Sequence, residues 1–232
     1  RGESDRRLAV LTREQGRLDV IAKGARKGGS RLSAATEPLS FARIQVHSGQ
    51  RMAYVTQAEP QTAFRGLRAD YDRLTMALAF AELVAAVSQT DLPDPGLFDL
   101  AFQALSAIEL HPDPLVALVW AELQLMESEG VLPVLDRCVV CDRPLAESPA
   151  AVSPGAGGNV CGLHAADHLD RYLVSGEVLI GLARTAELPE PPPRLKRALE
   201  GLRALSPLWE AVAHASLPAR GSLLRELMSE NR

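Results

Sequence analysis

Three cysteines and one histidine form two closely spaced pairs in the second half of the chain. Two residues separate Cys138 from Cys141 and Cys161 from His164, and nineteen residues lie between the pairs. Such spacing lets both side chains of a pair reach one ion, while the longer loop brings the second pair round to complete a tetrahedron. Thiolate and imidazole ligands in this arrangement suit Zn²⁺ best. The spacing therefore predicts a structural zinc site, with no coordination position left for water or substrate.

Two other arrangements of these residues remain open. A disulfide between Cys138 and Cys141 would leave Cys161 without a partner. His168 lies one helical turn beyond His164 and could replace it as the nitrogen ligand. The zinc interpretation uses all three cysteines of the chain, which the disulfide does not.

The segment 137–166 must fold so that the two pairs meet. The aspartate and proline after the first pair favour the turn that this pair needs. Residues 153–159, Ser-Pro-Gly-Ala-Gly-Gly-Asn, predict the tip of a hairpin. Over residues 160–172 the pattern favours a helix, which would place Cys161 and His164 on one face of its first turn.

The first sixty residues have the alternating pattern of short strands. The predicted strands are 6–12, 17–24, 41–47 and 52–59. Four strands with hairpin-length gaps indicate a small antiparallel sheet or barrel, and a five-stranded OB barrel is the main candidate. Its first strand would then be truncated or lie before Arg1.

Helical spacing replaces this pattern after residue 60. The helices are predicted at 66–89, 97–110, 114–130, 176–184, 194–205, 208–217 and 222–228. The fold class is therefore α+β. We expect an OB-fold β-barrel at 1–60 and an α-helical domain at 61–232, with a Cys3His zinc module inserted at 137–166.

Charge is distributed unevenly along the chain. Residues 1–75 carry 14 Lys+Arg against 8 Asp+Glu, whereas residues 76–232 carry 11 against 21. A positive N-terminal part suggests a polyanionic partner. The Gly-rich segment 24–31 is basic and lacks the Gly-Lys-Ser/Thr ending of a phosphate-binding loop, so we expect a mobile basic loop beside a nucleic-acid groove. A merely solvated loop is the alternative.

Signals for catalysis, membrane insertion and secretion are weak or lacking in the sequence. No G-x-S-x-G, H-E-x-x-H or Walker pattern occurs, so we expect a binding protein and not an enzyme. No apolar run approaches the roughly 18 residues that span a bilayer, and we recognise no secretory leader. Clustered cysteines fit a reducing, cytoplasmic setting.

The residues above resemble the RecO family of bacterial recombination mediators. The resemblance is carried by GESDRRLAVLTREQGRLDVIAKGARKGGSRL at the start, by the helical middle, and by AELQLMESEGVLPVLDRCVVCDRPL leading into the first cysteine pair. It implies an OB barrel, a helical domain and a zinc module. Members often have four cysteines, and His164 stands here at the fourth place. The family's usual opening segment is absent, so the barrel is expected to lack an edge strand.

The resemblance also implies a function in a nucleoid-associated, cytoplasmic setting. It implies binding of single- and double-stranded DNA, annealing of complementary strands, and, with RecR, loading of RecA onto strands coated with single-strand-binding protein. The tail of that protein would dock on the helical part, at a basic residue beside an apolar pocket. The candidates for this contact are Arg171, Arg184, Lys196 and Arg203.

We expect a cluster of basic residues near the barrel to contact DNA phosphates. Its members are Arg6, Arg7, Arg17, Lys23, Arg26, Lys27, Arg31 and Arg43. Only Phe41, Tyr54 and Phe64 are aromatic in the first 65 residues, so phosphate contacts should outweigh base stacking. A zinc-stabilised protein scaffold with incidental DNA contact is the alternative of a different class, and a nuclease or hydrolase ranks third.

Overall fold

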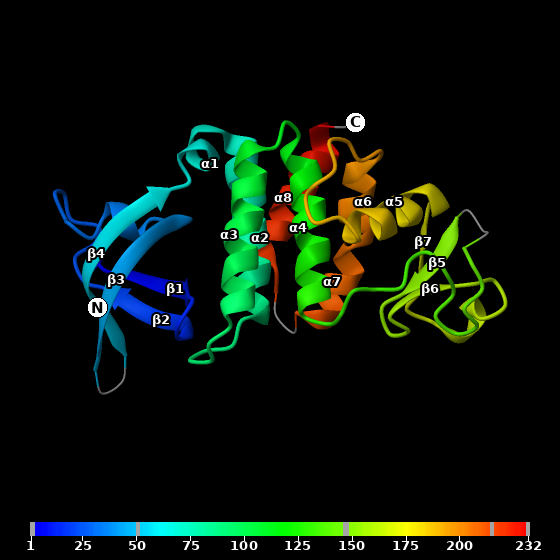
Figure 1. Cartoon of the computed structure of the whole chain (residues 1–232), viewed down its shortest axis with the longest axis horizontal. Helices are drawn as coiled ribbons and strands as arrows, with labels where there is room; N and C mark the ends of the chain where they lie inside the picture. Colours follow the sequence, from blue (N-terminus) through cyan, green and yellow to red (C-terminus); the bar gives the residue numbers. More distant parts are fainter. Residues whose placement is uncertain (1–2, 50–51, 146–148, 214–215, 231–232) are drawn as a thin grey trace. The chain divides into compact units, whose positions relative to one another are not determined.

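The computed structural model describes residues 3–49, 52–145, 149–213 and 216–230. The chain divides into two compact units, Arg1–Glu109 (unit 1) and Leu110–Arg232 (unit 2). Strands open unit 1 and helices complete it, while unit 2 is mainly helical and carries a second, smaller sheet (Figure 1).

Unit 1 begins with a four-stranded sheet in the order β1-β2-β4-β3. Its strands are β1 (Arg6–Thr12), β2 (Gly16–Ala22), β3 (Ser40–Ser48) and β4 (Ala53–Ala63), with a 3-10 turn, η1, at Ala34–Thr36. β1 and β2 form one antiparallel hairpin and β3 and β4 another, while β2 and β4 pair in parallel. The predicted strands are confirmed. The sheet is mixed rather than antiparallel, and within the described residues no pairing of β1 with β3 closes a barrel.

The turn between β1 and β2 depends on a glycine. Gly16 has φ +69°, and a Cβ atom built there would lie 1.9 Å from the carbonyl oxygen of Leu92. The backbone of the segment after α2 therefore approaches the turn too closely for any side chain. Thr12 supports the same turn, because its hydroxyl donates to the carbonyl of Gly16 at 2.9 Å.

The helices of unit 1 are α1 (Arg65–Ala69), α2 (Tyr71–Val87) and α3 (Pro95–Leu110). The single helix predicted over 66–89 is split at Asp70, whose carboxylate accepts from the N–H groups of Asp72 and Arg73 and starts α2. An N-cap aspartate satisfies backbone donors that a continuing helix would otherwise bond itself. Arg73 then joins α2 to α3 by donating to the carbonyl of Ile108 at 2.6 Å.

Unit 2 is built around α4 (Pro114–Ser128), which is buried on nearly all sides. Asp113 caps it and Pro114 occupies its first turn, as the sequence predicts. The other helices are α5 (Gly176–Ala186), α6 (Ala198–Ala204), α7 (Ser206–Val212) and α8 (Pro218–Glu230). Trp120 and Trp209 are fully buried among them, so the aromatic bulk of this core comes from α4 and α7.

A three-stranded antiparallel sheet lies between α4 and α5 in the sequence. Its order is β6-β5-β7, formed by β5 (Ala150–Ser153), β6 (Gly158–Val160) and β7 (Tyr172–Val174) (Figure 1). β5 and β6 form the hairpin predicted at 153–159, with Ser153 opposite Gly158. This sheet is the frame on which the cysteines are placed.

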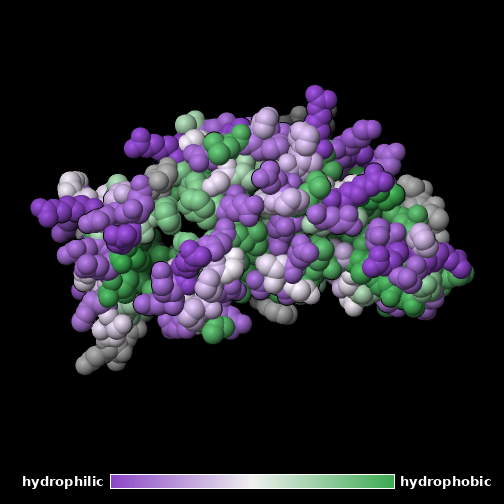
Figure 2. Space-filling model, in the orientation of Figure 1, coloured by the Kyte–Doolittle hydropathy of each residue, from purple (hydrophilic) through white to green (hydrophobic). Residues whose placement is uncertain are grey.

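No helix in the described part of the chain is both long and apolar enough to cross a membrane. Figure 2 shows hydrophilic residues over much of the visible face, with hydrophobic residues in smaller patches.

Candidate functional site

The four predicted metal ligands come together in unit 2. The Sγ atoms of Cys138, Cys141 and Cys161 and a ring nitrogen of His164 all lie within 4.8 Å of one another. Cys141 Sγ is 3.8 Å from Cys161 Sγ, and His164 Nδ1 is 3.6 Å from Cys138 Sγ and 3.3 Å from Cys161 Sγ. Ligand bonds of about 2.0–2.3 Å in a tetrahedron place ligand atoms roughly 3.5–3.8 Å apart. The cluster therefore fits one tetrahedral ion.

The first pair is positioned by a tight backbone turn. The N–H of Asp142 donates to the carbonyl of Cys138 at 2.9 Å, and the N–H of Cys138 donates to the carbonyl of Arg143 at 2.8 Å. Asp142 takes a left-handed conformation with φ 59°, which aspartate tolerates better than most residues. This turn brings Cys141 back beside Cys138.

The second pair follows β6 directly and does not lie in a helix. The carbonyl of Cys161 accepts from the N–H groups of His164 and Ala165 at 2.8 and 2.9 Å, and one 3-10 turn, η2 (Ala165–Asp167), follows. The helix predicted over 160–172 is therefore wrong, because the chain must leave the turn to form β7. The i and i+3 spacing still places both ligands together, since a single turn has nearly the same spacing as a helix.

The alternatives to this ligand set are not seen. All three cysteines are free thiols, so Cys138 and Cys141 form no disulfide. Among the described residues His168 is not a member of the cluster. His168 instead ends η2, and its carbonyl accepts from Arg171 at 2.9 Å.

Cys138 is the buried member of the cluster, and its surroundings favour a thiolate. Burial alone would raise the pKa of the thiol, but backbone hydrogen bonds from Cys161, Cys141 and Val140, together with His164, lower the pKa to about 6. The N–H of Cys161 donates to Cys138 Sγ at 3.3 Å. Because a metal binds the thiolate form, this network prepares the site for a cation.

The hairpin beside the cluster is fixed at both ends. The backbone of Val134 pairs with β6, donating to the carbonyl of Gly157 at 3.0 Å and accepting from Asn159 at 2.7 Å. At the hairpin tip the Asp170 carboxylate accepts from the Ser153 hydroxyl and from the N–H of Gly155, both at 2.7 Å. The hydrogen bonds from Gly155 and Ser153 lower the pKa of Asp170.

Six of the eight predicted phosphate-binding residues are exposed in unit 1. None of them forms an ion pair with another described residue. They are Arg7 on β1, Lys23, Arg26, Lys27 and Arg31 in the segment after β2, and Arg43 on β3. These side chains are available to an external anion.

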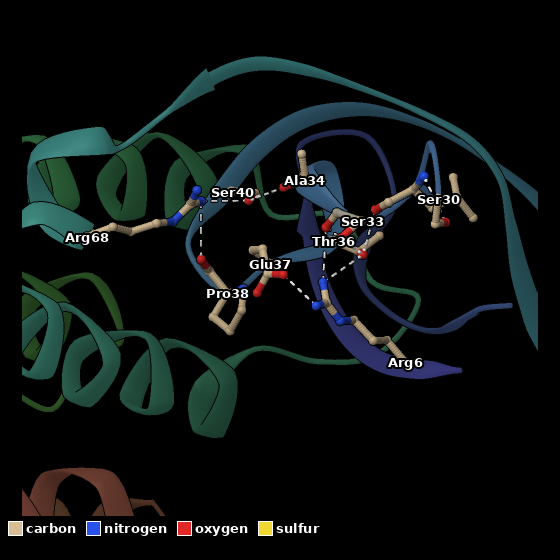
Figure 3. A network of polar contacts seen from close by, with 10 residues as sticks. Arg6, Ser30, Ser33, Ala34, Thr36, Glu37, Pro38, Ser40 and Arg68 are labelled. Carbon is tan, nitrogen blue, oxygen red and sulfur yellow. Dashed lines mark hydrogen bonds and ion pairs between the residues drawn. The ribbon is translucent and has the colours of Figure 1, made fainter. Parts of the chain in front are cut away.

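Arg6 and Arg17 are instead engaged inside unit 1. Arg6 donates to the Ser33 carbonyl at 3.0 Å and to the Thr36 hydroxyl at 3.2 Å, and pairs with Glu37 (Figure 3). Arg17 donates to the carbonyl of Ala85 at 2.7 Å and joins β2 to the end of α2. Both side chains hold the fold together, so we leave them out of the proposed DNA surface.

Successive turns run through the basic segment 24–31. The N–H of Gly24 donates to the Asp5 carboxylate at 2.8 Å, and the N–H of Arg26 donates to the carbonyl of Ser4 at 2.9 Å. Ala25 between them is fully buried and belongs to the core of the sheet. The backbone of this loop is therefore hydrogen-bonded to the residues before β1, while its basic side chains are exposed.

The three aromatic residues of the N-terminal part have different surroundings. Phe41 and Phe64 pack against Phe102 of α3, and their ring centroids lie 5.1 and 5.5 Å from the centroid of the Phe102 ring. Tyr54 instead has the Lys23 ammonium 4.5 Å from its ring centroid. Sequence reasoning identified Lys23 and Tyr54 separately and missed that they are neighbours.

A hollow of about 820 Å³ lies within unit 1, between β1 and β3 on one side and α2 and α3 on the other. Its lining is mainly apolar and includes Leu8, Val10, Phe41, Phe102 and Leu105. Hydrophobic residues are visible beside it in Figure 2. The two unpaired sheet edges, β1 and β3, both border this hollow.

The four basic residues considered for a protein tail are all exposed in unit 2. Arg171 follows η2, Arg184 lies on α5, Lys196 precedes α6 and Arg203 lies on α6. Nothing in their surroundings distinguishes one of them as the rim of an apolar pocket.

Comparison with known proteins identifies the family. Residues 1–64 match the model described as recombination protein O N terminal, and residues 68–204 match recombination protein O C terminal. The division predicted at residue 60 stays a prediction. Beyond residue 204 the chain, including α8, is outside both matches.

Several curated relatives are each named "DNA repair protein RecO". The chain is 40% identical over 163 residues to that of Heliobacterium modesticaldum, covering 68% of this chain and 59% of the relative. It is 36% identical over 160 residues to that of Desulfitobacterium hafniense, covering 69% and 58%. It is 32% identical over 214 residues to that of Anaeromyxobacter sp. strain K, covering 88% and 84%.

The first two matches thus span under two thirds of those relatives' own lengths. The two family models nevertheless cover most of this chain, and the Cys3His cluster lies inside the C-terminal match. The chain belongs to the RecO family.

Proposed function

We propose that this protein acts in DNA repair and recombination by binding single- and double-stranded DNA through the exposed basic side chains of unit 1. The observation that carries the proposal is the set of six exposed cations without an ion-pair partner among the described residues, presented by the sheet and by the loop after β2. Unpaired cations release counterions from phosphates when DNA binds, which drives sequence-independent association.

Annealing follows from the same chemistry. Cations that contact two strands at once reduce the repulsion between their phosphates, so complementary bases can meet without any covalent step. The names of the relatives support a role in DNA repair. We further propose that the protein works with RecR to load RecA onto DNA coated with single-strand-binding protein, whose tail docks on unit 2.

The test uses three neighbouring cations of the basic segment. Replacing Lys23, Arg26 and Lys27 by Ala should weaken DNA binding. It should also reduce the magnitude of the slope of log K against log salt concentration by about 2. Fluorescence anisotropy with a labelled oligonucleotide over a salt series measures both quantities. The matched control replaces three exposed cations of unit 2, the residues Arg184, Lys196 and Arg203. Equal effects from both triple variants would remove the basic segment from the mechanism.

We propose that the Cys3His cluster holds a structural Zn²⁺. Four protein ligands fill a tetrahedral ion and leave no position for substrate, so the metal would stabilise the fold around β5–β7. Elemental analysis should find about one zinc per chain, and Cys161→Ser should lose it. Zinc-free wild type with an intact fold would contradict the proposal.

We also propose that the sheet of unit 1 is four strands of an OB barrel. This proposal is supported by the parallel pairing of β2 with β4 and by the order β1-β2-β4-β3, to which one further strand between the free edges would add the fifth. The apolar hollow borders both free edges.

A protein-joining scaffold is the second candidate function. Its support is the excess of acidic residues in 76–232, which hold 21 Asp+Glu against 11 Lys+Arg. The two functions are separated by anisotropy with single-stranded DNA at low and moderate salt. A scaffold with incidental DNA contact would show weak binding even at low salt.

A further inference from the structure

One face of the sheet in unit 1 is turned away from the core of that sheet. Side chains alternate along a strand, and Leu8, Val20 and Val55 point into the core. Their neighbours in the sequence therefore lie on the opposite face. Arg7 is one of them, and it is exposed.

Strand pairing places four residues of this outer face in one row. Arg7 of β1 pairs with Ile21 of β2, Ile21 pairs with Tyr54 of β4, and Tyr54 pairs with His47 of β3. Paired residues share a face of a sheet, so the row crosses all four strands. It has basic or imidazole groups at its ends and an aromatic ring between them.

Lys23 adds a cation to the middle of this row. It lies two residues beyond Ile21, and its ammonium is 4.5 Å from the centroid of the Tyr54 ring. Gly49 lies against the ring edge, since a Cβ built on it would be 3.0 Å from Cε2 of Tyr54. The ring thus has a defined position, with a cation on one face. A base that stacks on that face displaces the ammonium, which then binds the adjacent phosphate.

We propose that Tyr54 is a base-stacking residue for single-stranded DNA, with Lys23 and Arg7 binding the adjacent phosphates. This inference rests on the proposed DNA-binding function and names the residue that selects unpaired strands. A ring can stack on a base only when that base is not held between neighbouring base pairs, as in a single strand. Duplex DNA offers only its backbone to the same row.

Within residues 3–65 the other aromatic side chains do not compete for this role. Phe41 and Phe64 already pack against Phe102, and Phe64 is buried. Tyr71 is exposed, but it lies at the start of α2 and outside the sheet. It therefore provides a matched control of the same residue type.

The experiment compares Tyr54→Leu with Tyr71→Leu on three probes of equal length. The probes are a single-stranded oligonucleotide, a single strand with abasic sites throughout, and a duplex. Tyr54→Leu should weaken binding to the normal single strand by about 5-fold to 100-fold. It should leave the abasic and duplex affinities and the salt slope within about 2-fold of wild type. Tyr54→Phe keeps the ring and should retain single-strand binding.

The outcomes distinguish this inference from the function on which it rests. Equal loss on all three probes, or no loss on the normal strand, overturns the stacking role while DNA binding itself stands. Failure of the wild type to bind any probe overturns the proposed function. Photocrosslinking of wild type to a halogenated-uracil oligonucleotide, mapped by mass spectrometry, should label Tyr54. Because this needs no variant, an unlabelled Tyr54 with label elsewhere contradicts the inference even if Tyr54→Leu misfolds.

Discussion

Glu122 and Arg220 form an ion pair inside unit 2, and replacing either partner alone should strongly destabilise the fold. Glu122 on α4 is fully buried, and its carboxylate accepts two bonds of 2.9 Å from the Arg220 guanidinium on α8. Trp209 on α7 donates to the same carboxylate at 3.0 Å. Arg220 also donates to the Ser206 hydroxyl at 2.7 Å and to the Leu202 carbonyl at 2.9 Å. The network therefore joins four helices.

Removing one charge leaves the other buried and without its partner. In Arg220→Met the Glu122 carboxylate keeps only the neutral donor of Trp209 among these bonds. Breaking a buried pair in this way costs about 3–5 kcal/mol of unfolding free energy. At roughly 2–4 °C per kcal/mol, the melting temperature should fall by about 6–20 °C. The melting temperature of Glu122→Gln should fall by a similar amount, because the buried guanidinium then lacks the opposite charge of the carboxylate.

The double variant Glu122→Leu with Arg220→Met removes both charges. Its main remaining loss of unfolding free energy, about 1–3 kcal/mol, comes from the Trp209 N–H, which has lost its acceptor. Packing of the new apolar side chains offsets part of this loss. It should therefore be more stable than either single variant. Urea unfolding followed by tryptophan fluorescence measures all three, with Arg225→Met, an exposed change on the same helix, as control. If the double variant lost as much stability as the two single variants added together, the pairing argument would be refuted.

Two further predictions concern the hairpin beside the Cys3His cluster. Gly158→Ala should lower the free energy of unfolding by at least about 2 kcal/mol and weaken metal retention, because φ is +147° and the new Cβ would lie 2.1 Å from the Val134 carbonyl oxygen. Thermal melts and zinc content test this prediction. The control is Gly28→Ala, whose new Cβ would meet nothing within 4 Å. Because the pKa of Asp170 is lowered in the folded state, its carboxylate stabilises the fold at pH values above the ordinary carboxyl pKa of about 4. This stabilisation is lost as the pH falls through the pKa of the folded state. The difference in melting temperature between wild type and Asp170→Asn should therefore shrink as pH is lowered from 7 to 3, and a constant difference would contradict this cause.

Much of the local structure follows from the sequence because its causes are local. Alternation predicted the four strands of unit 1, and Asp113 with Pro114 predicted the start of α4. The Cys3His cluster was predictable for the same reason, since two short spacings restrict where the four side chains can lie. The predicted helix over 160–172 failed because the pairing of β7 with β5 ends it after one turn.

Only the tertiary structure decided which charges are available and which residues share a surface. Arg6 and Arg17 look like Arg7 in the sequence, but their hydrogen-bond partners come from residues 27 or more positions away. The pairing of Tyr54 with Ile21, and the burial of Glu122 against Arg220, depend on contacts between distant segments. Sequence periodicity reports the face on which a residue lies, whereas its partners are set by how those faces pack.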